Sequence, residues 1–199
     1  KGSPVLRRNF LDVVLAQSSA VYRNYLVEYN RILQQRNAIL KLLAEQRASA
    51  AQLDVWDPQL VETGSRIIAA RYRAVKALGE AAAELHAEMT GQGESLTMIY
   101  RPFYETDGLT ESGAVLDLPE IVSRFEQAMS MRRKDEKRRG VTLVGPQRDD
   151  VVFLINSVDA RIFGSQGQQR TVVLSCKLAE AEFIKSETGE YPVLLLDDV

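Results

Sequence analysis

Apolar side chains recur at helical spacing over two long stretches in the first half of the chain. From about Val21 to Arg47 they stand three and four residues apart, which is the period of an amphipathic helix with a wide apolar face. A break follows at 49–55, and Asp57-Pro58 then has the pattern of an N-cap with proline at the first helical position. The same period continues to about Thr90. Two long helices joined by a short break predict an antiparallel hairpin.

Shorter apolar runs alternate with helical patterns in the second half of the chain. The runs are bounded by glycine, proline, asparagine or aspartate, which is typical of strands, and the helical stretches keep a period of three to four residues. The remaining predicted elements are strands at 96–101, 141–144, 151–155, 160–163 and 193–196, and helices at 118–139 and 166–186.

These elements predict a mixed α/β (α+β) chain built from two parts. Residues 1–139 are mainly helical, whereas residues 140–199 place several short strands around one helix. The hydrophobic pattern changes at Gly140 from long helical stretches to short apolar runs, and we therefore set the predicted domain boundary between 139 and 140.

Composition argues against a disulfide, a zinc site and a membrane-spanning segment. Cys176 is the one cysteine and His86 the one histidine, so neither an internal disulfide nor a zinc site of the usual kind is expected. His86 is expected to be structural, because no second ligand stands near it in sequence. No apolar run is long enough to cross a bilayer, so no membrane is expected and the cytoplasm is the expected location.

The last predicted strand ends in two carboxylates. Four consecutive aliphatic residues at 193–196 indicate a strand that is buried on both faces, and Asp197 and Asp198 follow directly. Ligands of open α/β sheets lie at the carboxyl ends of strands. One carboxylate there can hold Mg²⁺ and a second can orient an attacking water, as in the Walker B pattern of ATPases.

The predicted helix at 166–186 begins with an unusual first turn. Ser165 and Gln168 have the spacing of a capping box, which by itself explains both residues. It does not explain Gly167, since a glycine inside a helix costs up to about 1 kcal/mol relative to alanine. A glycine in the first turn lets another group approach the backbone, where free N–H groups attract an anion. The segment is therefore either a plain helix cap or a receptor for a γ-phosphate.

A basic stretch ends the predicted helix at 118–139. Residues 131–139 hold six basic side chains and two acidic ones. The stretch is either a solvated helix end, whose cations suit the helix dipole, or a patch that contacts DNA phosphates. The candidate DNA-binding residues are Arg132, Arg133, Lys134, Lys137, Arg138 and Arg139.

Taken together, these motifs resemble ABC-type ATPases, and among them the RecF family of bacterial DNA-repair ATPases, which is related to Rad50 and SMC proteins. Residues 165–170 resemble the ABC signature motif, and the strand ending in Asp197-Asp198 resembles Walker B. The RecF-like segments are Gly2-Ser3-Pro4, Arg7-Arg8, Phe10-Leu11-Asp12, Gln35-Arg36-Asn37, 145–150 (GPQRDD), 165–171 (SQGQQRT) and 194–199 (LLLDDV).

The resemblance implies a fold and a mechanism. Residues 1–139 would form an arm lobe, and 140–199 the signature and Walker B part of an ATPase head. Two ATP-bound heads would dimerise, so that Ser165, Gln166, Gly167 and Gln168 contact the nucleotide held by the partner. Asp197 would serve Mg²⁺, and Asp198 would be the catalytic residue that positions water. The intact protein would be a weak ATPase that binds double-stranded DNA at gaps or junctions and helps RecO and RecR to load RecA.

Three alternatives remain open from the sequence. An SMC- or Rad50-like head would carry a much longer coiled coil than the predicted hairpin. A transporter ATPase has its signature and Walker B closer together than 165 and 197. A non-enzymatic helical interaction module would need no phosphate-binding loop anywhere in the reading frame.

The chain itself lacks the loop G-x-x-x-x-G-K-[ST], because Pro146-Gln147 follow the glycine pair Gly140 and Gly145. The resemblance implies that this loop precedes Lys1. We therefore expect the isolated chain neither to hydrolyse ATP nor to bind it tightly, since that loop supplies most triphosphate contacts. Calorimetry with ATP and Mg²⁺ measures this directly, and micromolar binding would contradict the expectation.

Overall fold

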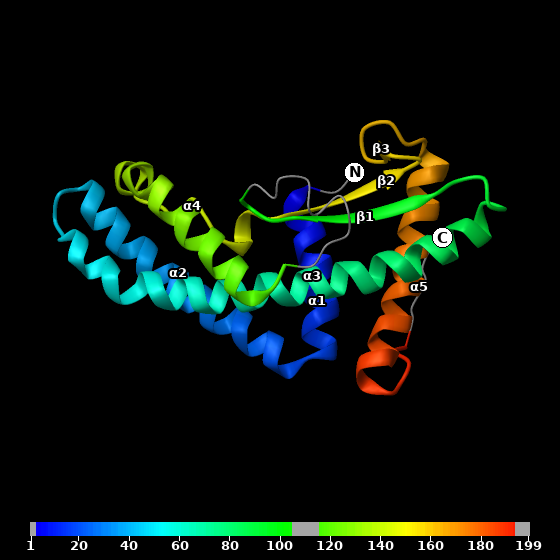
Figure 1. The fold of residues 1–199 in the computed structure, drawn as a ribbon, viewed down its shortest axis with the longest axis horizontal. Coiled ribbons are helices and arrows are strands. Elements are labelled where there is room, and N and C mark those ends of the chain that lie inside the picture. Colours follow the sequence, from blue (N-terminus) through cyan, green and yellow to red (C-terminus); the bar gives the residue numbers. More distant parts are fainter. Residues whose placement is uncertain (1–2, 105–115, 194–199) are drawn as a thin grey trace.

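A single helix, α3 (Trp56–Met89), runs along the length of the molecule and contacts most of the other elements (Figure 1). The computed structural model describes residues 3–104 and 116–193. At one end of α3 lie α2 (Ala20–Ala44) and α4 (Leu118–Arg139), and at the other end lie a small sheet and α5 (Gln166–Thr188). Helix α1 (Pro4–Ser18) lies between these two ends (Figure 1).

The predicted hairpin of two long helices is confirmed as α2 and α3, which run antiparallel and pack together (Figure 1). A 3₁₀ helix, η1 (Ala50–Val55), forms the break between them. The predicted N-cap is wrong: Val55 occupies that position, and Asp57 lies in the first helical turn. Its carboxylate instead accepts a hydrogen bond from Arg36 at 2.8 Å and is paired with Arg133, so tertiary partners take the place of the cap.

Helix α1 was not predicted from the hydrophobic pattern. It buries only Leu11, Val14 and Leu15, while Val5, Leu6 and Val13 are exposed, so no clean apolar stripe marks it in the sequence. Proline in its first turn suits a helix start. Ser19 then ends α1 and caps α2 by accepting a hydrogen bond from the N–H of Tyr22.

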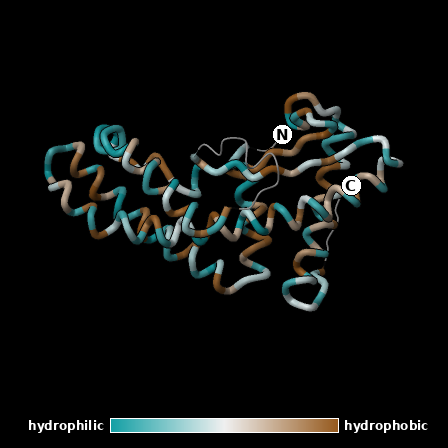
Figure 2. The backbone as a smooth tube through the Cα atoms, in the orientation of Figure 1, coloured by the Kyte–Doolittle hydropathy of each residue, from teal (hydrophilic) through white to brown (hydrophobic). Residues whose placement is uncertain are grey.

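Helix α4 agrees at both ends with the helix predicted at 118–139. Asp117 caps it by accepting from the N–H of Glu120, and Gly140 ends it with a φ of 67°. The helix packs on both α2 and α3. Apolar segments lie along the helices, whereas the end of α4 that carries the basic stretch is hydrophilic (Figure 2).

The sheet has the order β1-β2-β3 and is antiparallel. Its strands are β1 (Leu96–Arg101), β2 (Asp150–Ile155) and the two-residue β3 (Val158–Asp159). Leu96 pairs with Ile155 and Arg101 with Asp150, which confirms the strands predicted at 96–101 and 151–155. Asn156 and Ser157 take positive φ in the tight turn between β2 and β3.

Two predicted strands are wrong. Residues 141–144 form no strand, because side chains take up their backbone donors: Asn37 accepts from the N–H of Thr142 and Glu136 from that of Leu143. Residues 160–163 form turns, in which the N–H groups of Ile162 and Phe163 bond back to the carbonyl of Asp159. In both segments other hydrogen bonds replace the ladder that a strand would need.

Helix α5 confirms the prediction for 166–186 and packs across α3. The strand predicted at 193–196 extends beyond the described residues. Strand β1 precedes the predicted domain boundary at 139/140 and β2 follows it, so the sheet joins the two predicted parts, and the boundary stays a prediction. In the part of the chain that the structure describes, every helix is too short or too polar to cross a bilayer.

Glu136 offers a test of the packing between α2 and α4. Its carboxylate is fully buried and accepts from the Arg36 guanidinium at 2.6 Å, whereas the neighbouring Asp135 pairs with exposed arginines. We expect Glu136→Ala to lower the free energy of unfolding by about 3–5 kcal/mol, because Arg36 loses its fully buried partner. Asp135→Ala, the matched control, should cost less than about 1 kcal/mol. Urea denaturation measures both, and equal losses would contradict this account.

Candidate functional site

The N-terminus of α5 is closed by a complete capping box. The Ser165 hydroxyl accepts a hydrogen bond from the N–H of Gln168 at 3.2 Å, and the Gln168 side-chain oxygen accepts from the N–H of Ser165 at 2.8 Å. The predicted local geometry is therefore confirmed. With its oxygen used as an acceptor, the Ser165 hydroxyl keeps its own proton for an outside partner.

This helix end is open to solvent. Ser165, Gln166 and Gly167 are all exposed, and among the described residues a Cβ at Gly167 would meet only the Ser165 hydroxyl oxygen, at 3.9 Å. Packing inside the chain therefore does not require glycine there. Among the described residues, no acceptor bonds to the backbone N–H of Gln166 or Gly167, so these two donors point to a site that can take an anion.

The loop before α5 is held rigidly. A Cβ at Gly164 would lie 2.4 Å from the Ala160 carbonyl oxygen, so only glycine fits this position. The Gln169 side chain donates to the carbonyls of Ala160 and Gly164 at 3.1 and 3.0 Å. The turn that replaces the predicted strand at 160–163 leaves the Phe163 side chain 72% exposed, and the predicted strand did not indicate this exposure.

Asp197 and Asp198, the candidate metal and catalytic residues, lie outside the described residues. Within residues 3–104 and 116–193, no group of three or more His, Cys, Asp or Glu side chains is arranged to hold a metal ion.

The six cations of the basic stretch have different environments. Arg133 is paired with Asp57 and with Asp54 at 3.3 Å, which ties it to the start of α3. Arg132 and Arg138 both pair with Asp135. In the described part of the chain Lys134, Lys137 and Arg139 form no ion pair, and of these Lys134 and Arg139 are exposed.

Asp149 of the GPQRDD segment is a buried structural centre that sequence reasoning did not identify. Its carboxylate accepts from Arg71 at 2.9 Å, from the Phe103 N–H at 2.9 Å and from the Tyr100 hydroxyl. Burial raises the pKa of Asp149 to about 7, and the Arg71 guanidinium pulls the pKa in the opposite direction. Because donors within the chain already bind both carboxylate oxygens, we assign Asp149 a structural role. The same segment holds Gln147, which accepts from the Tyr29 hydroxyl at 2.6 Å.

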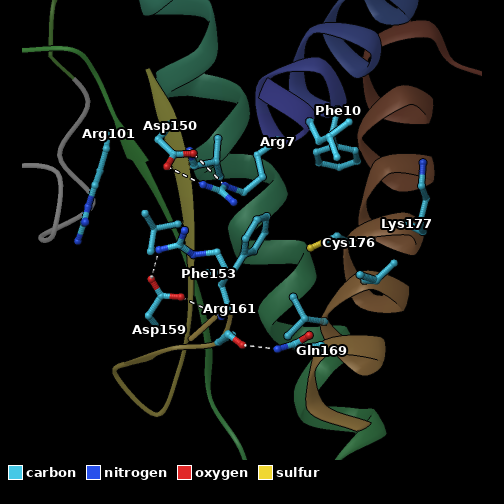
Figure 3. A pocket seen from close by; sticks show the side chains of 16 residues that line it. Arg7, Phe10, Arg101, Asp150, Phe153, Asp159, Arg161, Gln169, Cys176 and Lys177 are labelled. Carbon is cyan, nitrogen blue, oxygen red and sulfur yellow. Dashed lines mark hydrogen bonds and ion pairs between the residues drawn. The ribbon is translucent and has the colours of Figure 1, made fainter. Parts of the chain in front are cut away.

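A cavity of about 320 Å³ lies between α1, β2 and α5 (Figure 3). Its lining combines apolar side chains such as Phe10 and Phe153 with charged ones, including Arg7, which binds Asp150 through two hydrogen bonds of 2.9 and 2.7 Å. Cys176 also lines it, and burial raises the pKa of this thiol to about 12, so the thiol stays protonated near neutral pH. The cavity is thus a mixed recess, in which apolar side chains lie beside paired charges such as Arg7 and Asp150.

Comparison with known proteins places the whole chain. No protein-family model matches it. The chain is 44% identical over 199 residues to the DNA replication and repair protein RecF of Symbiobacterium thermophilum, and 45% identical over 200 residues to that of Halothermothrix orenii. Both alignments cover 100% of the chain and 51% and 52% of the relatives, so the chain spans about half the length of the curated relatives it matches.

Solved structures agree with these relatives. The structure described as the recombination mediator protein RecF-ATPrS in the RecFOR pathway matches with a TM-score of 0.91 and 34% identity, over 100% of this chain and 52% of that one. A second, described as RecF-ATP in the same pathway, matches with a TM-score of 0.83 at the same identity, over 100% of this chain and 51% of that one. Over its whole length the chain thus matches a part of the RecF proteins, about half of their length, and the solved RecF structures share its fold.

Proposed function

We propose that the protein to which this chain belongs is an ATP-dependent DNA-binding protein of recombinational gap repair, active in the cytoplasm. Two ATP-bound heads close into a homodimer, and each places the N-terminus of its α5 against the nucleotide held by the other. The solved relatives described as RecF-ATPrS and RecF-ATP support nucleotide binding. Their RecFOR pathway supports RecO and RecR as partners, with which the protein would help to load RecA.

The observation that carries this proposal is the exposed, preformed start of α5. The free N–H groups of Gln166 and Gly167 and the hydroxyl of Ser165 together offer donors to a γ-phosphate, at the positive end of the helix dipole. Gly167 leaves room for that phosphate to approach. Gln168 contributes by holding Ser165 in place, since the oxygen of its side chain is bonded within the cap.

Hydrolysis would need groups beyond α5. By family resemblance Asp197 holds Mg²⁺ and Asp198 positions the attacking water, while the phosphate-binding loop comes from a part of the relatives that this chain does not cover. Mg²⁺ would offset the negative charge of the triphosphate. The protein would then be a weak ATPase whose two sites each depend on the α5 of the partner.

DNA binding would use the end of α4. Arg133 is committed to Asp57, and Arg132 and Arg138 share Asp135, so the exposed Lys134 and Arg139 are the cations best placed to reach phosphates. We propose that they contact double-stranded DNA when two heads close, and that Arg133 supports the fold of the arm.

Ser165→Asp separates a cap from a nucleotide contact. Aspartate caps a helix as well as serine does, so the melting temperature and ATP binding of the full-length protein should not change. Against the γ-phosphate of the partner, however, a carboxylate costs several kcal/mol, and ATP-driven dimerisation and hydrolysis should be lost. Sedimentation with and without ATP measures this. Ser19→Asp, which changes the cap of α2, is the control, and a Ser165→Asp variant that still dimerises would exclude the contact in trans.

Two matched double variants test the DNA surface. Lys134→Gln with Arg139→Gln should weaken DNA binding by the full-length protein, and the salt slope of binding should fall by about 0.9 for each phosphate that is no longer neutralised. Arg73→Gln with Lys76→Gln removes the same two residue types from the exposed side of α3 and should leave the slope unchanged. Fluorescence anisotropy over a salt series gives both slopes. Equal slopes in the two variants would return the stretch to a solvated helix end.

A further inference from the structure

The side chain that caps α5 is itself held from outside the helix. The Gln168 amide nitrogen donates to the carboxylate of Glu94 at 2.8 Å, while the amide oxygen of Gln168 accepts from the N–H of Ser165. Glu94 lies in the turn between α3 and β1, 74 residues earlier in the chain. A capping box is complete without such a partner, so this contact adds a constraint that the cap alone does not need.

A buried histidine stands behind Glu94. The second carboxylate oxygen of Glu94 lies 3.2 Å from Nε2 of His86, whose side chain is fully buried. The other ring nitrogen, Nδ1, lies 3.4 Å from the hydroxyl oxygen of Ser175, a fully buried residue of α5. The His86 ring therefore lies between Glu94 on one side and Ser175 of α5 on the other. A proton on Nε2 gives Glu94 a hydrogen-bond donor.

The backbone of the turn is fixed as well. The residue after Glu94, Ser95, donates through both its N–H and its hydroxyl to the side-chain oxygen of Asn156, at 2.9 and 3.1 Å. Asn156 returns a bond of 2.9 Å from its own N–H to the Ser95 carbonyl. Glu94 is thus anchored to α3 through His86 and to the turn between β2 and β3 through Ser95.

From this geometry we propose that Glu94 is a positioning residue for the signature motif. It holds the Gln168 side chain in the cap, so that Ser165 and the free N–H groups of Gln166 and Gly167 keep the arrangement that receives the phosphate of the partner. This inference rests on the proposed function of α5. Glu94 touches neither the motif's free donors nor the exposed face of Gly167, and it acts through Gln168 alone.

A carboxylate suits this role for two reasons. A hydrogen bond from an amide to an ionised oxygen is stronger than one to a neutral oxygen, so Gln168 is held more firmly. The negative charge also lies near the positive end of the α5 dipole, which stabilises the helix start. Preorganised donors cost no rearrangement when the phosphate arrives, and this raises affinity without a new contact.

Hydrogen exchange and dimerisation in the full-length protein test the proposal together. In Glu94→Ala we expect the backbone N–H of Gln168 to exchange about tenfold faster, since the cap opens more often. ATP-driven dimerisation should weaken by about the same factor, while ATP binding by each head is unchanged. Glu94→Gln should recover most of both losses, because its amide oxygen can still accept from Gln168 and the His86 ring can accept from its amide nitrogen, although the charge is gone. Glu88→Ala removes an exposed carboxylate from the end of α3 and is the matched control.

The outcomes distinguish this inference from the proposed function. An unchanged exchange rate of the Gln168 N–H in Glu94→Ala would overturn the positioning role. A second contrary result is possible when Ser165→Asp fails to dimerise as expected. In that case, faster exchange in Glu94→Ala together with unchanged dimerisation would overturn the positioning role but not the proposed function. If the Ser165→Asp variant still dimerises with ATP, the proposed role of α5 in trans fails. The positioning role of Glu94 then fails with it, even if Gln168 exchanges faster in Glu94→Ala.

Discussion

A buried arginine must find several acceptors at once, and two such arginines bring the distant segments of this chain together. The guanidinium of Arg71 on α3 binds Asp12 of α1, Asp149 and the carbonyl of Pro146. That of Arg36 on α2 binds Asp57, Glu136 and Thr142. Removing a charge from water costs several kcal/mol unless its partners are in place, so each arginine is tolerated only in the assembled fold. Between them, the two clusters tie α1, α2, α3 and α4 to the segment that leads into β2.

The long helices and β1 could be predicted because their own residues carry the signal. Apolar spacing gave α2, α3, α4 and α5 with ends near those observed, and the bounds of β1 agree with the prediction. Two of the errors fall where a partner distant in the sequence decides the structure. Asp57 has the sequence of a cap but binds Arg36, and the donors of 141–144 bond to the side chains of Asn37 and Glu136 instead of a neighbouring strand. A local pattern contains no information about such partners.

In the candidate site, too, the local feature could be predicted from the sequence and the contacts with distant residues could not. Ser165 and Gln168 are three residues apart, so their capping box could be predicted from spacing, and the structure has it. Glu94 and His86 could not be connected to it, because only the packing of α3 against α5 brings them near. For the basic stretch, composition gave six equal cations, whereas the fold assigns Arg133 to Asp57 and leaves Lys134 and Arg139 exposed.

Helix α3 joins the two parts that the sequence analysis separated. Two glycines inside it allow close packing at different points along its length: a Cβ at Gly64 would lie 2.6 Å from the Phe125 ring of α4, and one at Gly79 would lie 3.2 Å from Met98 of β1. The first turn of the helix supplies Asp57 to the arginines of α2 and α4, and its last turns supply His86 to Glu94. One uninterrupted helix thus contacts both the basic end of α4 and the residues that hold the cap of α5. A division of the chain at residue 139 separates sequence patterns, while the contacts of α3 and the β1–β2 pair cross it.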